Sequence, residues 1–131
     1  MEQTPLFRPR VLIVEDEAIV AMEIQDQMES LGWDVCGIAA TGPDAIRRAA
    51  ADRPDLILMD NTLRGGMTGL EAAEIIRAGR TVPIVFLTAT VDERIIARIR
   101  KLDPEAGSLS KPFNEADLRR ETERALRRPK A

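Results

Sequence analysis

The chain has 131 residues, a formal net charge of −3 and 31% charged residues. It is therefore long enough for one hydrophobic core, and it lacks the basic excess typical of DNA-binding proteins. It contains no histidine and a single cysteine, Cys36, which excludes hydrolase triads that use histidine, HExxH zinc sites and an intramolecular disulfide. No stretch has the length and apolar content of a signal peptide or a membrane span, so we expect a cytoplasmic protein without a DNA or membrane partner.

The first predicted unit is a buried strand at residues 11–14 followed by a helix at about 17–31. The strand is an apolar, mostly β-branched run, and three carboxylates follow it directly, at residues 15–17. Gly32 stands where the end of a helix is expected. The apolar positions at helical spacing are Ile19, Val20, Ile24, Met28 and Leu31. The methionines that we expect to fill the core are Met22, Met28 and Met59.

The second unit is a weaker strand at residues 34–40 followed by a helix at about 43–52. We expect the hydroxyl of Thr41 and the carboxylate of Asp44 to cap opposite amides at the start of this helix. Pro54 ends the unit, because the residue before a proline is disfavoured in helical geometry.

The third unit begins with a strand at residues 55–60, an unbroken apolar run that closes on Asp60. Such a run predicts a central parallel strand that is buried on both faces. A loop with three glycines follows at residues 61–69, and a helix then ends at Gly79. Because open α/β sheets bind ligands at the carboxyl edge of their strands, Asp60 is the first candidate for a functional residue.

The last two units predict strands at residues 83–88 and 108–110, separated by an amphipathic helix at 91–102. The fourth strand ends in Thr88, and Lys111 follows the fifth. The residues that we expect to shape the final helix are Asn114 as its cap and Leu118, Ala125 and Leu126 on its inner face.

Five β/α units in succession predict an α/β fold with one five-stranded parallel sheet and helices on both faces. Right-handed crossovers favour the strand order 2-1-3-4-5, which is the flavodoxin-like, doubly wound (βα)5 arrangement. In this order the first and third strands are neighbours, so we expect Glu15, Asp16 and Asp60 to meet in one pocket. Thr88 and Lys111 stand at the ends of the next two strands.

Three carboxylates in one pocket repel one another, and a hard divalent cation with oxygen ligands, Mg²⁺ or Mn²⁺, would neutralise them. Asp16 and Asp60 are the candidate direct ligands. We expect the Asp60 carboxylate to attack phosphorus and to form an acyl phosphate. The ammonium of Lys111 and the hydroxyl of Thr88 are then available for the phosphoryl oxygens.

Four motifs lie at the strand ends or directly after them: Glu15-Asp16, Asp60, Thr88-Ala89 and Lys111-Pro112-Phe113. Together they resemble the receiver domain of bacterial two-component response regulators, over about residues 10–127. The resemblance implies that the Lys111-Pro112 peptide bond is cis. The site roles that it implies are Asp60 as the phosphoacceptor and a metal ligand, Asp16 as a second Mg²⁺ ligand, Glu15 as a ligand through water, the backbone carbonyl of Thr62 as a further ligand, Thr88 as the hydroxyl that follows the phosphoryl group, and Lys111 as its ion-pair partner.

The same resemblance implies a stand-alone regulator, with an extension at residues 1–9, the receiver domain at 10–128 and a short tail at 129–131. The expected partner is a sensor histidine kinase, followed by a histidine phosphotransfer protein or a downstream target. A homodimer through the fourth and fifth helices is a further expectation. Such a protein signals through altered protein contacts or a phosphorelay and is not an enzyme.

The sequence departs from the family pattern at three places. The loop at residues 63–69 lacks the proline that relatives often carry. Ser108 stands three positions before Lys111, where many relatives carry an aromatic residue. Thr62 and Thr90 occupy two positions that influence autodephosphorylation in the family.

Three other functions compete with this interpretation. A degenerate receiver would keep the fold and act only as a scaffold. A phosphatase of the haloacid dehalogenase type also forms an aspartyl phosphate, but it needs an acid two residues after the nucleophile, where this chain has Thr62. A flavodoxin would bind the FMN phosphate after the first strand, where residues 15–17 are all acidic and would repel it.

Overall fold

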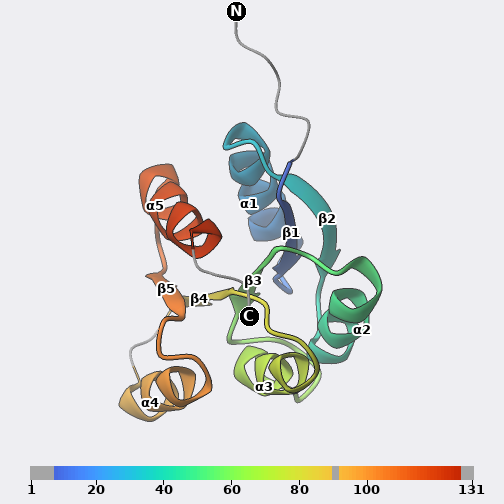
Figure 1. Ribbon diagram of the computed structural model, residues 1–131, viewed down its shortest axis with the longest axis vertical. Coiled ribbons are helices and arrows are strands. Elements are labelled where there is room, and N and C mark those ends of the chain that lie inside the picture. Colours follow the sequence, from blue (N-terminus) through green and yellow to red (C-terminus); the bar gives the residue numbers. More distant parts are fainter. Residues whose placement is uncertain (1–7, 90–91, 128–131) are drawn as a thin grey trace, which may run out of the picture.

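The computed structural model describes residues 8–89 and 92–127, which form one five-stranded parallel sheet with helices on both faces (Figure 1). The strand order is β2-β1-β3-β4-β5, which confirms the predicted fold class. The strands are β1 (Arg10–Val14), β2 (Asp34–Ala39), β3 (Leu56–Asp60), β4 (Ile84–Thr88) and β5 (Gly107–Ser110). The helices are α1 (Ala18–Ser30), α2 (Gly42–Asp52), α3 (Gly69–Gly79), α4 (Glu93–Leu102) and α5 (Glu115–Leu126).

Some predictions fall outside the described residues. These are most of the extension at residues 1–9, the variable position Thr90, the start of the fourth helix at Val91, and the tail at 129–131.

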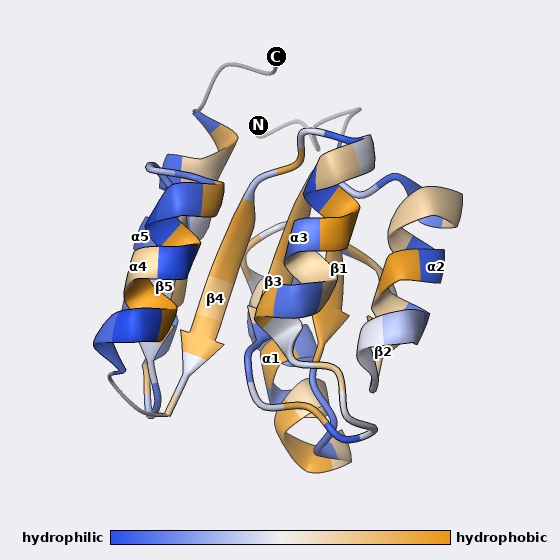
Figure 2. Cartoon of the chain, turned by 90° about the horizontal axis from the view of Figure 1, so that it is seen from below, coloured by the Kyte–Doolittle hydropathy of each residue, from blue (hydrophilic) through white to orange (hydrophobic). Residues whose placement is uncertain are grey.

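The hydrophobic core consists of two apolar layers, one on each face of the sheet. Helices α2, α3 and α4 cover one face, where Met59 and Phe86 are buried, and helices α1 and α5 cover the other, where Ile13 and Leu58 are buried. Successive residues of a strand point to opposite faces, so the central strands, which lie between two helix layers, are apolar up to their last residue, and Figure 2 shows β4 as mostly hydrophobic.

Strand β3 lies at the centre of the sheet and is buried along its whole length. In the register with β1, Val14 pairs with Met59, and in the register with β4, Asp60 pairs with Leu87. The residue that follows Val14 therefore lies beside Asp60, at the carboxyl edge of both strands.

Two predicted core residues are exposed instead. Met22 is 61% exposed and Leu126 is 44% exposed, so the predictions that they pack inward are wrong. Each follows a buried alanine, Ala21 or Ala125, and one residue along an α-helix turns the side chain by about 100°. Helical spacing identified an apolar face on each helix but not where that face ends.

One of the two capping interactions predicted for the start of α2 is present. The hydroxyl of Thr41 accepts the backbone N–H of Asp44 at 3.2 Å, but the Asp44 carboxylate pairs with the guanidinium groups of Arg47 and Arg48. These arginines lie one turn further along the helix and offer charge-assisted hydrogen bonds, which are stronger than a neutral amide donor.

Helix α5 begins at its predicted cap, Asn114, whose side chain accepts the backbone N–H of Asp117 at 2.8 Å. Arg119, Arg120 and Arg124 are exposed on this helix, and the last two form ion pairs with acids on the same helix. The basic residues of this helix thus lie on a solvated face.

Candidate functional site

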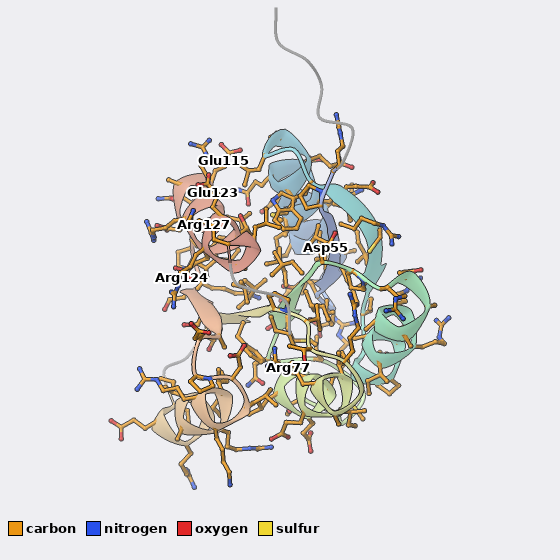
Figure 3. All side chains as sticks on the ribbon, in the orientation of Figure 1. Asp55, Arg77, Glu115, Glu123, Arg124 and Arg127 are labelled. Atoms are coloured by element: carbon orange, nitrogen blue, oxygen red, sulfur yellow. The ribbon has the colours of Figure 1, made fainter. Side chains whose placement is uncertain are left out.

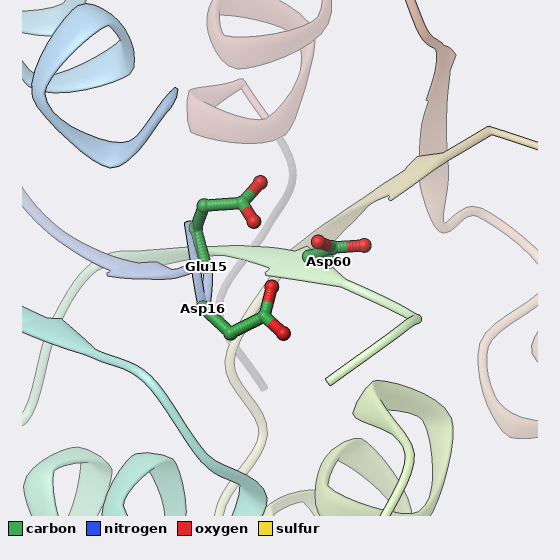
Figure 4. Close-up of side chains that lie close together, drawn as sticks. All are labelled: Glu15, Asp16 and Asp60. Atoms are coloured by element: carbon green, nitrogen blue, oxygen red, sulfur yellow. The ribbon is translucent and has the colours of Figure 1, made fainter. Parts of the chain in front are cut away.

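Three carboxylates converge at the carboxyl edge of the sheet. Glu15 and Asp16 follow β1, and Asp60 ends β3. Each offers one oxygen within 4.8 Å of the others, and Figure 4 shows the three groups around a common space. The side chain of Glu15 is fully buried and that of Asp60 is 7% exposed. The predicted acidic pocket is therefore present in the fold.

Lys111 reaches this cluster from the end of β5. Its ammonium Nζ donates to Glu15 Oε1 at 2.9 Å and to Asp60 Oδ2 at 3.2 Å. The backbone N–H of Lys111 donates to the carbonyl of Thr88 at 2.8 Å, and the Lys111-Pro112 bond is cis, as predicted. Burial by itself would lower the pKa of Lys111, but its hydrogen bonds and ion pairs with Glu15 and Asp60 outweigh that effect and raise the pKa.

Backbone hydrogen bonds hold the acidic side chains in place. Glu15 donates its N–H to the carbonyl of Ala39, and its Oε2 accepts the N–H of Glu17 at 3.2 Å. Asp60 Oδ1 accepts the N–H of Thr62 at 3.0 Å. Asp60 is thus held by a backbone donor on one oxygen and by an ammonium group on the other.

The loop after β3 is tied to the site by Asn61, which was not predicted as a functional residue. Its N–H donates to the carbonyl of Leu87, its carbonyl accepts the N–H of Gly69, and its side-chain Oδ1 accepts the N–H of Leu70. A Cβ at Gly69 would lie 2.1 Å from the backbone oxygen of Asp60. Only glycine lets the start of α3 approach the end of β3 this closely.

Arg64, in the same loop, forms an ion pair with Asp16 that the sequence did not reveal. The distance between Arg64 Nε and Asp16 Oδ2 is 3.5 Å, and the arginine side chain is 78% exposed. The loop also forms an isolated β-bridge between Thr41 and Arg64. A cation at this place compensates part of the charge on Asp16 while its side chain stays largely exposed to solvent.

Thr88 ends β4, the strand next to β3, and lies at the same edge of the sheet as Asp60. It lines a cavity of about 200 Å³ between β4, β5 and α4, together with Ser108, Ile95 and Ile99. The small side chain of Ser108 thus borders open space beside Thr88. Thr62, the remaining predicted site residue, is exposed and contacts Asp60 through its amide.

The charges of the cluster do not balance. Three acidic side chains, those of Glu15, Asp16 and Asp60, stand against two basic ones, the ammonium of Lys111 and the exposed guanidinium of Arg64. An oxygen-only set of ligands with an excess negative charge suits a hard divalent cation better than a soft metal.

The family model of the response regulator receiver domain matches residues 11–123 of the chain. The chain belongs to this family. All the site residues described above lie within the matched segment, and the receiver fold accounts for their meeting at one edge of the sheet.

Two curated bacterial proteins are similar to this receiver domain. The transcriptional regulatory protein PdtaR of Mycobacterium tuberculosis is 36% identical over 112 residues, covering 83% of this chain and 52% of that protein. The phyllosphere-induced regulator PhyR of Methylorubrum extorquens is 38% identical over 110 residues, covering 82% of this chain and 40% of that protein. The chain thus spans about half the length of these relatives.

Solved receiver structures superimpose closely on the chain. The signal receiver domain of a modulated diguanylate cyclase from Desulfovibrio desulfuricans gives a TM-score of 0.83 at 39% identity, covering 92% of this chain and 94% of that one. The Vibrio cholerae chemotaxis protein CheY4 gives a TM-score of 0.83 at 27% identity, covering 92% and 100%. Within residues 8–89 and 92–127, no helix of the receiver domain combines the length and apolarity needed to cross a bilayer.

Proposed function

We propose that Asp60 accepts a phosphoryl group from the phosphohistidine of a sensor histidine kinase. The observation that carries this proposal is the environment of the Asp60 carboxylate. It ends the central strand, shares a pocket with Glu15 and Asp16, and is held by the ammonium of Lys111. A buried carboxylate among other carboxylates, with one cation that reaches it from another strand, is arranged to receive a group that carries its own negative charge.

The ligand set fits Mg²⁺ or Mn²⁺. The three carboxylates lie within 4.8 Å of one another, and both cations prefer oxygen ligands. We assign Asp16, Asp60 and the backbone carbonyl of Thr62 as direct ligands, with Glu15 acting through a water molecule. When bound, the cation neutralises the carboxylates and withdraws charge from the phosphoryl oxygens.

In the transfer step an oxygen of the Asp60 carboxylate attacks phosphorus in line with the phosphohistidine nitrogen. The new P–O bond forms as the N–P bond breaks, and the electron pair of that bond returns to the imidazole, which takes up a proton from solvent. The product is an acyl phosphate on Asp60. Thr62 N–H already holds Asp60 Oδ1 at 3.0 Å, which fixes the orientation of the carboxylate.

Two further side chains act on the phosphoryl group. Lys111 ion-pairs with a phosphoryl oxygen, exchanging its present contacts with Glu15 and Asp60 for a more highly charged acceptor. Thr88 donates its hydroxyl to another phosphoryl oxygen. Because Thr88 borders the cavity beside Ser108, its movement changes the surface between β4, β5 and α4.

The kinase contact extends over the start of α1. Ile19 is 74% exposed and Met22 is 61% exposed, and Ile19 borders the same surface hollow as Asp16 and Arg64. A phosphohistidine that reaches Asp60 brings its protein against this apolar surface. A histidine phosphotransfer protein or a downstream target would use the same approach, and a homodimer through α4 and α5 remains part of the proposal.

The residue two positions after Asp60 distinguishes a signalling protein from a phosphatase that hydrolyses its acyl phosphate in each catalytic cycle. Thr62 has no carboxylate to activate water, so the acyl phosphate persists as a signal instead of being hydrolysed in a catalytic cycle. The proposed protein is thus a phosphorylated signalling protein of the cytoplasm and not an enzyme.

Incubation with Mg²⁺ and a small acyl-phosphate donor tests this function by intact mass spectrometry. We expect one phosphoryl adduct on the wild-type chain, removed by hydroxylamine and by omission of Mg²⁺, and none on Asp60→Asn. Asp26→Asn, which removes an exposed aspartate from α1, is the matched control and should be labelled normally. Continuous release of phosphate would instead indicate a phosphatase, and the lack of an adduct on every variant would indicate a scaffold.

A further inference from the structure

A second cavity lies at the edge of the sheet opposite the acidic cluster. It has a volume of about 280 Å³ and lies between α2 and α3, near the ends of both helices. Helices of a parallel α/β sheet begin at the carboxyl edge of the strands and end at the other edge, so this cavity is separated from Asp60 by the length of the sheet. Its apolar wall includes Ile46, Ala50, Ile75 and Ile76.

Two arginines, Arg53 and Arg80, line the same cavity. Within residues 8–89 and 92–127, neither forms a salt bridge within 4.0 Å. The Arg80 nitrogen Nη1 is buried and has no hydrogen-bond partner in that part of the chain. Burial of a guanidinium nitrogen without an acceptor is unfavourable. Because Nη1 itself is closed to solvent, an anion in the cavity would contact Arg80 where that residue lines the cavity.

The charge at Arg80 is incompletely compensated by its surroundings. Burial and, next, the nearby positive charge of Arg53 lower the pKa of Arg80, and the opposing effect of the Asp55 carboxylate is smaller. The ends of α2 and α3 add a partial negative charge of about half an elementary charge each. These helix ends favour the presence of the two arginines but do not supply a hydrogen-bond acceptor to Nη1.

The backbone places Arg53 at this position by an unusual conformation. Arg53 ends α2 in the left-handed region, with φ 48°, and its N–H donates to the carbonyl of Ala49. Left-handed backbone is unfavourable for residues other than glycine and asparagine. The conformation leaves the arginine at the wall of the cavity, close enough to Arg80 for their charges to interact.

The apolar wall faces solvent at the mouth of the cavity, where Ile75 is 49% exposed. An apolar hollow with a few converging polar groups is the usual form of a small-molecule site, and a volume of about 280 Å³ accommodates a small ligand and not a folded partner. An apolar part of a ligand would pack against the apolar wall, and an anionic part of the same ligand would contact the two guanidinium groups.

From this cavity we propose that the receiver domain binds a small amphipathic carboxylate, an acid carried on an apolar body. The carboxylate accepts hydrogen bonds from Arg80 and ion-pairs with Arg53, and the apolar body packs against Ile46 and Ile75. This site is separate from the phosphorylation proposed at Asp60 and does not depend on it.

Titration of the full chain with 4-phenylbutyrate, followed by ¹H–¹⁵N NMR, tests the proposal. We expect saturable shift changes confined to the end regions of α2 and α3, and binding about tenfold weaker in Arg80→Met, because a charge-assisted hydrogen bond is lost. Arg119→Met removes an exposed arginine from α5 and should bind like the wild type. The uncharged analogue 4-phenylbutan-1-ol should bind the wild-type chain about as weakly as the acid binds Arg80→Met.

Ala50→Trp provides a second variant that does not alter the arginines. Ala50 is exposed on α2 and lines the cavity, so an indole there should block the ligand without disturbing the core. Shift changes that are absent, spread over the whole surface, or equal in wild type, Arg80→Met and Ala50→Trp would overturn the proposal. Binding of an acidic peptide in place of the small acid would also overturn it, and would identify the surface as a protein contact.

Discussion

The acidic cluster and the Arg77–Asp103 pair, both within the described part of the chain, differ in their balance of charge. At the acidic cluster, Glu15 and Asp60 share the ammonium of Lys111, at 2.9 and 3.2 Å. Between α3 and the segment after α4, Arg77 pairs with Asp103 at 3.3 Å, with side chains only 14% and 5% exposed. The first place has more acids than bases, whereas the second is matched one to one.

Both members of the balanced pair make further hydrogen bonds to the backbone. Arg77 (Figure 3) donates to the carbonyl of Val82 at 2.8 Å as well as to Asp103, and the other Asp103 oxygen accepts the N–H of Glu105. Such a pair locks α3 against the chain that leads to β5. The acidic cluster needs another cation or a modification to reach a similar balance of charge. We therefore assign a function to the cluster and a structural role to the Arg77–Asp103 pair.

Removal of the arginine from the Arg77–Asp103 pair should give the largest decrease in the free energy of unfolding. Arg77→Met leaves the Asp103 carboxylate buried without its cation, and we expect a loss of about 3 kcal/mol in the free energy of unfolding, measured in urea. Arg98→Met is the matched control, because Arg98 pairs with Glu74 on α3 with both side chains exposed, at 52% and 41%. Its expected cost is below about 1 kcal/mol. Equal costs for the two variants would contradict the structural role of the buried pair.

Removal of the Lys111 ammonium from the acidic cluster should lower the free energy of unfolding by less, when measured without Mg²⁺. Lys111 is 25% exposed, so solvent compensates part of the loss, and we expect Lys111→Met to cost about 2 kcal/mol. Added Mg²⁺ should recover part of this stability in the variant, because the cation takes over the neutralisation of the carboxylates.

The stability supplied by Lys111 should also depend on pH. Its pKa is raised in the folded chain above the ordinary value of 10.5, so the contribution is complete below that pH and is lost as the pH rises through the folded-state pKa. The difference in unfolding free energy between wild type and Lys111→Met should therefore be constant from about pH 7 to about pH 9 and should narrow above the ordinary pKa. A difference that widened with rising pH would contradict the ion pairs.

Neutralising one acid in each place should change stability in opposite directions. Asp60→Asn removes one of several like charges and should raise the free energy of unfolding by about 1 kcal/mol without Mg²⁺. Asp103→Asn makes the same chemical change in the balanced pair and should lower it. If both variants were destabilised, the excess of negative charge at the site would have no energetic consequence.

The smallest expected effect concerns Arg64, which pairs with Asp16 from an exposed position. Arg64→Ala removes a competitor for that carboxylate, and we expect Mg²⁺ to bind about two- to threefold more tightly by calorimetric titration at low salt. Arg94→Ala, which removes a 94% exposed arginine from α4, should leave the affinity unchanged. Weaker Mg²⁺ binding in Arg64→Ala would mean that Arg64 supports the metal site.

The sequence predicted the sheet because its strands are short apolar runs separated by helices of clear periodicity. Once the strand order is known, the meeting of Glu15, Asp16 and Asp60 follows from their places directly after two neighbouring strands. The ion pairs of Arg64 and Arg77 were not predictable in this way, because each joins segments whose separation depends on loop geometry.

One feature that was not predicted, the cap of α3, had a signal in the sequence. Thr68 and Glu71 form a full capping box at the start of α3, and the spacing Thr-x-x-Glu is a known sign of a helix start. The position of Met22 had no such signal. Its exposure depends on which stripe of α1 packs on the sheet, and Ala21 is small enough to let that stripe pack closely.

Our central proposal is that Asp60 of the acidic cluster accepts a phosphoryl group. Borohydride trapping tests this proposal most directly. Reduction of an acyl phosphate converts the modified aspartate to homoserine, which tandem mass spectrometry locates in the chain. After incubation with Mg²⁺ and an acyl-phosphate donor, we predict homoserine at position 60 of the wild-type chain and at no other acid of the cluster. Homoserine at position 16, or an unmodified position 60 in a fully folded sample with Mg²⁺ present, would contradict the account.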